Sequence, residues 1–172
     1  MTDNQRRVLV GMITAAVFSF AFIVLAYLYL PLKLSAMTSV GERLSFALRC
    51  DLLAVLMLLL GIGVVARQRF FSTDAIDGSF ADRGSSLDIN VRYVQNTTEQ
   101  CLLLIVGHLV LATVVSEVGL KMIPILVALF VFARLCFWIG YHRSPISRAF
   151  GFAATFYPTV GVLLYDAYRV LL

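Results

Sequence analysis

Long stretches without charge are the feature that most constrains this chain. Residues 8–30 contain no charged side chain, and residues 44–66, 89–115 and 122–141 are predominantly apolar. A helix needs about 20 such residues to cross the hydrocarbon core of a bilayer. Hydrophobic residues make up 60% and charged residues 14% of the 172 residues, which is more apolar surface than a soluble domain of this size can bury. The sequence therefore predicts an all-α integral membrane protein.

The apolar stretches predict five transmembrane helices, over residues 8–30, 44–66, 89–115, 122–141 and 148–172. Pro31 ends the first helix because proline cannot continue it, and residues 70–88, rich in Ser, Gly and Asp, form a loop. Tight turns at residues 116–121 and 142–147 make the helices on either side antiparallel neighbours. We expect residues 1–42 to be an additional N-terminal helix with its connection, and residues 43–172 to be the main membrane domain.

The cationic residues orient the chain, because cytoplasmic loops of membrane proteins carry an excess of Lys and Arg. With a cytoplasmic N-terminus, the inner side receives eight of them: Arg6, Arg7, Arg67, Arg69, Arg83, Arg92, Arg143 and Arg148. The outer side receives five: Lys33, Arg43, Arg49, Lys121 and Arg169. We therefore predict a multi-pass protein of a cell's inner membrane with its N-terminus in the cytoplasm. The net charge of +4 comes without a basic run, which excludes a nucleic-acid-binding protein.

One face of the third expected helix carries three polar groups, Arg92, Asn96 and Glu99. Their spacing of i, i+4 and i+7 puts all three on the same side of a helix. Ionisable groups inside a membrane are costly unless they meet partners or line a polar cavity. This face is therefore either a ligand-binding site or an interhelical polar network, and in a network Arg134 is the expected partner of Glu99.

Polar residues from other helices fall at the same depth in this topology. Arg67 ends the second helix, Arg134 and Tyr141 lie on one face of the fourth, and Arg148 begins the fifth. Arginine pairs with carboxylates through two parallel hydrogen bonds, and Glu99 can accept from an ammonium group. Glutathione has two carboxylates, an amine and two amides, and so suits this cluster. An arginine near its thiol would favour the thiolate, which is the nucleophile.

Three segments resemble the family of membrane-associated proteins in eicosanoid and glutathione metabolism (MAPEG). Arg92, Asn96 and Glu99 match its signature, residues 133–144 followed by Arg148 are similar to its third-to-fourth helix region, and residues 67–69 resemble the basic end of its first helix. The resemblance covers residues 43–172. It implies a four-helix fold that assembles as a homotrimer, with glutathione bound between neighbouring subunits near the cytoplasmic face.

The resemblance also implies roles for individual residues. Arg148 matches the position proposed to activate the thiol, which makes it the candidate catalytic residue. The residues that match glutathione-binding positions are Arg67, Arg92, Asn96, Glu99, Arg134 and Tyr141. Phe137 and Gln100 depart from the pattern, because they stand where a family member has tyrosines. The additional N-terminal helix resembles the arrangement of a five-span member of the family.

Two hypotheses for the function follow. In the first, the chain is a glutathione-dependent transferase or peroxidase, and its lipophilic electrophile arrives through the bilayer. In the second, it is a non-catalytic lipid-binding or scaffold protein. Arg92, Asn96 and Glu99 favour the first hypothesis, whereas Phe137 and the additional helix favour the second. A small transporter is disfavoured because no inverted repeat is present in the sequence.

The remaining titratable residues indicate structural roles and no metal site. His108 is expected to hydrogen-bond to a neighbouring helix, since no second metal ligand stands at helical spacing from it. Asp166 and Arg169 have the i, i+3 spacing of an ordinary helical ion pair. Three cysteines lie in apolar stretches without metal-ligand spacing and are expected to be buried thiols: Cys50, Cys101 and Cys136.

Overall fold

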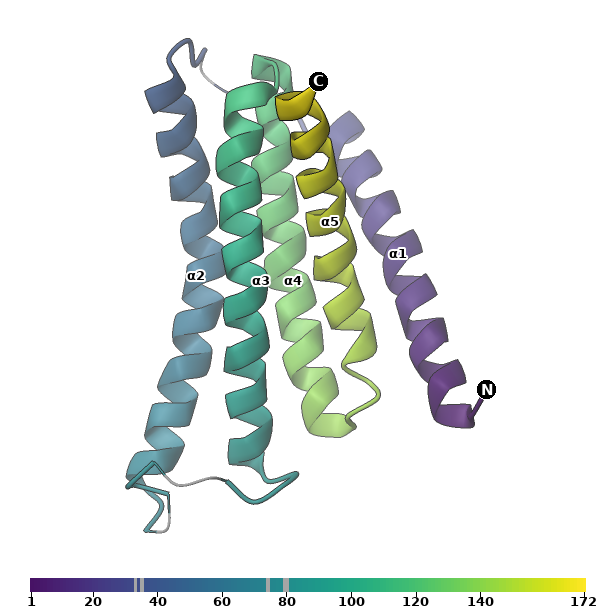
Figure 1. Ribbon diagram of the computed structural model, residues 1–172, viewed down its shortest axis with the longest axis vertical. Helices are drawn as coiled ribbons and strands as arrows, with labels where there is room; N and C mark the ends of the chain where they lie inside the picture. Colours follow the sequence, from purple (N-terminus) through teal and green to yellow (C-terminus); the bar gives the residue numbers. More distant parts are fainter. Residues whose placement is uncertain (33, 35, 74, 79–80) are drawn as a thin grey trace.

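The computed structural model describes residues 1–32, 34, 36–73, 75–78 and 81–172 (Figure 1). Lys33, which entered the charge count, and part of the expected loop at residues 70–88 lie outside the described residues. The described chain forms long helices joined by short connections: α1 (Asp3–Tyr29), α2 (Val40–Phe70), α3 (Ser86–Val114), the 3-10 helix η1 (Glu117–Lys121), α4 (Met122–Arg143) and α5 (Ala149–Leu171). The all-α prediction is confirmed.

The helices form a membrane-spanning bundle. By length and composition, α1, α2, α3 and the η1–α4 segment can each cross a membrane. The helix α5 has 23 residues, which exceeds the roughly 20 that a span needs, and it contains Pro158 and the buried carboxylate of Asp166. It packs on α4, α3 and α1 and runs the height of the bundle (Figure 1). The chain is therefore a multi-pass membrane protein.

Helix-capping residues extend the helices beyond the apolar stretches. The helix α1 begins at Asp3 instead of residue 8, because the Thr2 hydroxyl accepts from the Gln5 backbone N–H at 3.3 Å and the Gln5 side chain accepts from the Thr2 N–H in return. Ser39 and Glu42 form the same capping box ahead of α2. Each box satisfies N–H groups that the first turn of a helix leaves without partners.

The up-and-down order of the helices brings particular ends together. The N-terminus of α1, the C-terminal ends of α2 and α4, and the N-terminal ends of α3 and α5 lie at the lower end of the bundle in Figure 1. We call this the Arg92 end, and the opposite end, where η1 meets α4, the Lys121 end. The polar residues that the sequence places on α2, α3, α4 and α5 therefore gather toward the Arg92 end.

Glycine permits close contact between helices at two positions. A Cβ atom at Gly151 would lie 2.6 Å from the Ala133 carbonyl oxygen, so α5 rests directly on the backbone of α4. A Cβ atom at Gly61 would lie 2.7 Å from the Tyr93 ring, so α3 packs closely on α2. Small residues allow such close packing of helices in membranes. These contacts fix the positions of α3, α4 and α5 around the candidate site.

A buried pair of polar side chains, His108 and Asp51, lies nearer the Lys121 end of the bundle. His108 Nδ1 and Asp51 Oδ1 are 2.6 Å apart, and both side chains are buried, so the expected bond from His108 to a neighbouring helix is present. The expected pair between Asp166 and Arg169 is wrong. Asp166 is buried inside the bundle, whereas Arg169 is exposed and donates to the Tyr165 hydroxyl at 3.3 Å.

The helix α1 packs at the edge of the bundle against α5 and α4 (Figure 1). Proline lacks a backbone N–H, so Pro158 leaves the carbonyl of Ala154, four residues earlier, without its helical partner. The Ser19 hydroxyl of α1 donates to this carbonyl at 3.3 Å and is itself buried. Near the Lys121 end, the Lys121 ammonium donates to the Tyr27 carbonyl at 2.7 Å. The gap in α5 thus supplies the docking point for α1.

We predict that Ser19→Ala destabilises the protein by about 1 kcal/mol, because it leaves the Ala154 carbonyl without a partner in an apolar environment. In a Pro158→Ala background the same substitution should cost little, since the alanine that replaces the proline restores the helical N–H donor to that carbonyl. A double-mutant cycle of unfolding free energies in detergent measures this coupling. An equal cost of Ser19→Ala in both backgrounds would show that Ser19 and Pro158 act independently.

Candidate functional site

A cavity of about 580 Å³ lies at the Arg92 end of the bundle. Four helices, α1, α3, α4 and α5, contribute to its wall together with the connection between α4 and α5. The residues that line it are Val8 and Met12 of α1, Arg92 and Asn96 of α3, Phe137 of α4, Pro145, Ile146 and Arg148 before α5, and Ala149 and Phe152 of α5. The i, i+4 spacing of Arg92 and Asn96 brings both onto the cavity side of α3, as the sequence indicates.

Arg92 stands at the open edge of the cavity. Its Nε donates to Asp88 Oδ1 at 2.8 Å, one turn earlier on α3, and its side chain is 48% exposed. Asp88 in turn accepts from the Gly84 backbone N–H at 2.9 Å, so the carboxylate is held from two sides. The Arg92 guanidinium also lies near the Tyr141 hydroxyl. Arg92 is therefore oriented by α3 and α4 while much of it stays open to a ligand.

Arg148 provides a second cation in the cavity wall. It occupies the position immediately before α5, and its guanidinium lies 4.4 Å from the centre of the Tyr141 ring. A cation over an aromatic face is attracted by the ring quadrupole. The N-terminus of a helix also carries a partial positive charge and backbone N–H groups without helical partners. The start of α5 is thus a region of positive potential beside the cavity.

Arg134 is completely buried between α3, α4 and α5. Its guanidinium donates to Asn96 Oδ1 at 2.8 Å, to Thr155 Oγ1 at 2.6 Å and to the Gly151 carbonyl at 3.3 Å. These partners are neutral, and the Phe137 ring lies 4.6 Å from the cation. The structure therefore places Arg134 behind the cavity wall, where it holds together three helices.

The bond to Arg134 determines which end of the Asn96 amide faces the cavity. Arginine can only donate, so the atom that it contacts must be the Asn96 oxygen. The Asn96 NH₂ group is then left to donate toward the cavity that Asn96 lines. With the guanidinium groups of Arg92 and Arg148, this polar wall presents hydrogen-bond donors. Such a wall suits an anionic ligand, in particular one with carboxylates.

The other predicted site residues lie outside this wall. Tyr141 is buried beneath Arg148, and its ring packs edge-on against Phe137. Glu99 is exposed on α3, where its carboxylate accepts from Gln95 at 3.4 Å. The expected partnership of Glu99 with Arg134 is replaced by the bond from Arg134 to Asn96. Arg67 is exposed in the last turn of α2.

A polar network near the site was missed by the sequence analysis. Asn90 is buried one turn before Val94 and links three helices: its oxygen accepts from Trp138 at 2.7 Å and lies 2.9 Å from His142 Nε2, while its NH₂ donates to Gln68 at 2.9 Å. In the sequence, the one indication of this network is the presence of Asn90 in an otherwise amphipathic stretch. This network fixes the ends of α2, α3 and α4 below the cavity.

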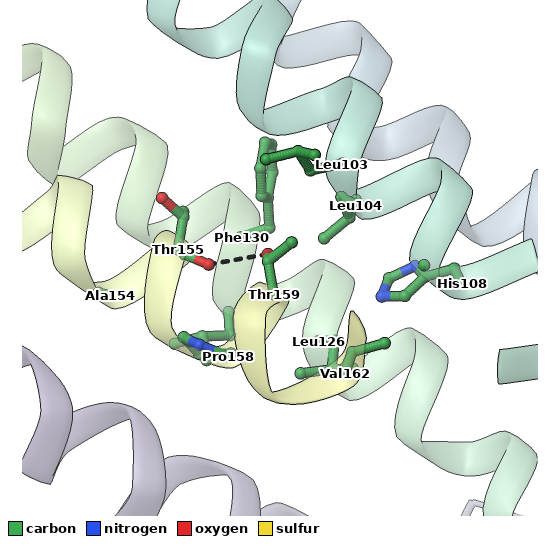
Figure 2. A pocket seen from close by; sticks show the side chains of 12 residues that line it. Leu103, Leu104, His108, Leu126, Phe130, Ala154, Thr155, Pro158, Thr159 and Val162 are labelled. Atoms are coloured by element: carbon green, nitrogen blue, oxygen red, sulfur yellow. Dashed lines mark hydrogen bonds between the residues drawn. The ribbon is translucent and has the colours of Figure 1, made fainter. Parts of the chain in front are cut away.

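A much smaller cavity lies deeper in the bundle between α3, α4 and α5 (Figure 2). Its volume of about 10 Å³ is close to the space of one water molecule. His108, Thr155 and Thr159 are the polar residues of its otherwise apolar lining, and Thr159 donates to the Thr155 carbonyl at 2.8 Å. Its size excludes an organic ligand. The cavity at the Arg92 end is the candidate functional site because Arg92, Asn96 and Arg148, three of the predicted site residues, line it.

Comparisons with known proteins agree with this architecture. The model of the MAPEG family matches residues 46–168. Transmembrane protein 79 of Bos taurus is 29% identical over 143 residues, which are 83% of this chain and 36% of that protein. Transmembrane protein 79 of Mus musculus is 26% identical over 162 residues, which are 94% of this chain and 41% of that protein.

These matches cover only part of each relative. The chain spans about two fifths of the length of the curated relatives it matches. Transmembrane protein 79 is also called mattrin and is a member of the MAPEG family. No solved structure matches the chain.

Proposed function

Because this chain belongs to the MAPEG family, we propose that it is a membrane-bound glutathione-dependent transferase or peroxidase that acts on a lipophilic electrophile. The observation that carries the proposal is the cavity of about 580 Å³ with Arg92, Asn96 and Arg148 in its wall. Its volume falls within the roughly 300–1,000 Å³ of small-molecule sites. A wall of hydrogen-bond donors fits the two carboxylates of glutathione.

In this proposal Arg92 and Asn96 bind the carboxylates and backbone carbonyls of the peptide. Glutathione supplies a thiol, which is nucleophilic after it loses its proton. Arg148 stabilises the negative charge of the deprotonated thiol, because its guanidinium adds to the partial positive charge of the α5 N-terminus. Tyr141 positions Arg148 through the ring contact at 4.4 Å. Arg134 positions Asn96 from behind the wall.

We propose further that the protein is a homotrimer. Glu99 is exposed about 20 Å along α3 from Ser86, at a rise of about 1.5 Å per residue, which puts a carboxylate well inside the membrane. An exposed carboxylate at that depth is costly when it faces lipid. A second copy packed on this face of α3 would cover it and add a wall to the site. Arg67 is exposed at the same end of the bundle, and the proposal assigns it to the binding of glutathione at this boundary.

The proposed orientation puts the Arg92 end and the N-terminus in the cytoplasm, within a cell's inner membrane. The excess of arginine at this end supports it. Glutathione would then reach the cavity from the cytoplasm. The lipophilic electrophile would arrive from the bilayer that surrounds the bundle.

A non-catalytic lipid-binding or scaffold function is the second candidate. The observation that favours it is the apolar share of the cavity wall: seven of the ten lining residues are apolar, since the polar ones are Arg92, Asn96 and Arg148. An anionic lipid would place its headgroup at the arginines and its chains on the apolar wall. Phe137, which offers no hydroxyl group to a ligand, is consistent with this function.

Substitution of Asn96→Asp tests the proposed binding mode, because it should affect stability and affinity in opposite directions. The introduced carboxylate would still accept from Arg134, now as a charge-assisted bond, so the ligand-free melting temperature should rise. The cavity would lose a donor and gain a negative charge, so the affinity for glutathione should fall about 10- to 100-fold. Calorimetric titration and thermal unfolding measure the two effects. Asn4→Asp, on the exposed first turn of α1, is the matched control, and an unchanged glutathione affinity in Asn96→Asp would refute the binding mode.

Glu99→Gln tests the homotrimer and the role of Glu99 together. If Glu99 contacts the ligand's ammonium group across a subunit boundary, loss of its charge should reduce glutathione affinity by roughly 1.5–3 kcal/mol and leave ligand-free melting nearly unchanged. Native mass spectrometry in detergent should detect trimers of the wild type. Monomers alone, or an affinity that does not respond to the substitution, would contradict this arrangement.

Arg148→Ala should act mainly on the reaction rate. A free thiol has a pKa of about 8.5, and lowering it by about two units takes about 2.7 kcal/mol of preferential thiolate stabilisation. Without Arg148 the rate–pH profile should shift to higher pH, while glutathione affinity changes by less than about tenfold. Arg143→Ala, at another arginine of the same end, is the control. Arg148→Lys, which keeps a cation, should bring the rate–pH profile part of the way back to that of the wild type. Identical profiles for wild type and Arg148→Ala would remove Arg148 from the mechanism.

A further inference from the structure

The cavity has a wall that the family match does not include. Val8 and Met12 stand four residues apart on α1, so both project from the same face of that helix, and both line the cavity. They lie before residue 46, where the match to the family model begins. The part of the chain that sets it apart from a four-helix bundle therefore contributes directly to the candidate site.

This wall is held in place by the contacts of α1. At Gly11 the backbone of α1 comes so close to α5 that a Cβ atom there would lie 3.5 Å from the Ala149 side chain. One turn further on, Ala15 is completely buried among small residues of α4 and α5. Ser19 then anchors α1 to the Ala154 carbonyl. Val8 and Met12 are thus presented by a docked helix and face the cavity from a defined position.

The two sides of the cavity differ in chemistry. Toward α3 and the start of α5 stand the donors Arg92, Asn96 and Arg148. Toward α1 stand Val8 and Met12, and Ile146 and Phe152 continue the apolar surface. A ligand set that fills such a cavity must combine anionic groups with an apolar group. Methionine has a flexible, unbranched side chain that adapts to apolar groups of varied shape.

We propose that Val8 and Met12 bind the alkyl chain of the lipophilic electrophile and so determine which substrates the site accepts. This inference rests on the proposed function. The polar wall takes glutathione, and α1 supplies the apolar surface on which a chain-bearing substrate lies with its reactive carbon toward Arg148. Removal of the chain's surface from water would supply the binding free energy, in proportion to the apolar area that is covered. The extra helix is then a specificity element of the enzyme.

Two matched pairs of substitutions test the inference in the full-length protein. Met12→Trp and Val8→Trp fill the apolar side of the cavity. Ile13→Trp and Leu9→Trp add the same group one position along, on the exposed part of α1, where the wild-type side chains are 55% and 43% accessible. Thermal unfolding of each variant establishes that it is folded.

The first measurement is selectivity. The ratio of kcat/KM for an electrophile with a long alkyl chain to that for its methyl analogue should fall by about tenfold or more in Met12→Trp and Val8→Trp. The ratio should stay at the wild-type value in Ile13→Trp and Leu9→Trp. A ratio that is the same in the wild type and all four variants would overturn the inference.

The second measurement does not depend on catalysis. A long-chain fatty acid that carries a photoreactive diazirine on its chain is incorporated with the protein into phosphatidylcholine vesicles, and labelled peptides are identified by mass spectrometry. Labelling should occur at the α1 segment around Val8 and Met12 and fall severalfold in Met12→Trp but not in Ile13→Trp. Labelling that is equal in the two variants would overturn the inference.

The two measurements also separate this inference from the proposed function. If wild-type protein binds no glutathione and conjugates no electrophile, yet the α1 segment is labelled and Met12→Trp blocks the labelling, the glutathione proposal fails. Val8 and Met12 would then bind the chain of a lipid, as the scaffold candidate requires. If glutathione is conjugated but neither selectivity nor labelling responds to Met12→Trp or Val8→Trp, the proposed function stands and the role of α1 is overturned.

Discussion

The bundle depends on one buried guanidinium. Arg134 lies in the middle of an apolar helix with no exposed surface, and its bonds to α3 and α5 go to neutral oxygens. A cation in such surroundings is tolerated when its donors find acceptors. Among the described residues Arg134 Nε has no acceptor, so the loss of a bond from Nη1 or Nη2 would add to a cost that is already present. The three helices must therefore keep the mutual positions at which Asn96, Thr155 and the Gly151 carbonyl converge. Gly151 contributes to this arrangement in two ways. Its carbonyl accepts from Arg134, and its lack of a side chain lets α5 pack directly on α4.

Arg134 also shapes the candidate site from behind the cavity wall. By holding the Asn96 oxygen, it turns the amide so that a donor faces the cavity. Its charge lies behind a wall that already contains Arg92 and Arg148, and Asp88 is the carboxylate paired with Arg92. Nearer the opposite end, Asp51 and His108 link α2 to α3 in a similar way. Apolar surfaces alone do not define the rotation of helices in lipid, so these polar contacts set it.

The sequence predicts where the helices lie, but it predicts poorly which side chains of different helices contact one another. Uninterrupted apolar stretches locate the spans, but the capping residues Thr2 and Ser39 extend two of them outward, and an S/T-x-x-E/Q pattern could have indicated this. Helical spacing is sufficient to put Arg92 and Asn96 on one face. Spacing within a helix says nothing about which residue of another helix is reached. Of the two alternatives for Glu99, a ligand site or a polar network with Arg134, the network pair is absent, because Arg134 bonds to Asn96. The contribution of α1 to the cavity carries no local signal, because Val8 and Met12 resemble any lipid-facing residues.

The way in which α1 docks has a consequence for biogenesis. Of the helices described, α1 is made before the other four long helices and packs mainly on α5, which follows them, partly through the contact of Ser19 with the Ala154 carbonyl. Until residues 149–171 have entered the membrane, α1 lacks its main packing partner and can contact only α4. The docking of α1 is therefore completed only after α5 has been inserted. A nascent chain that stalls before Pro158 would leave α1 without the contact that Ser19 makes with α5.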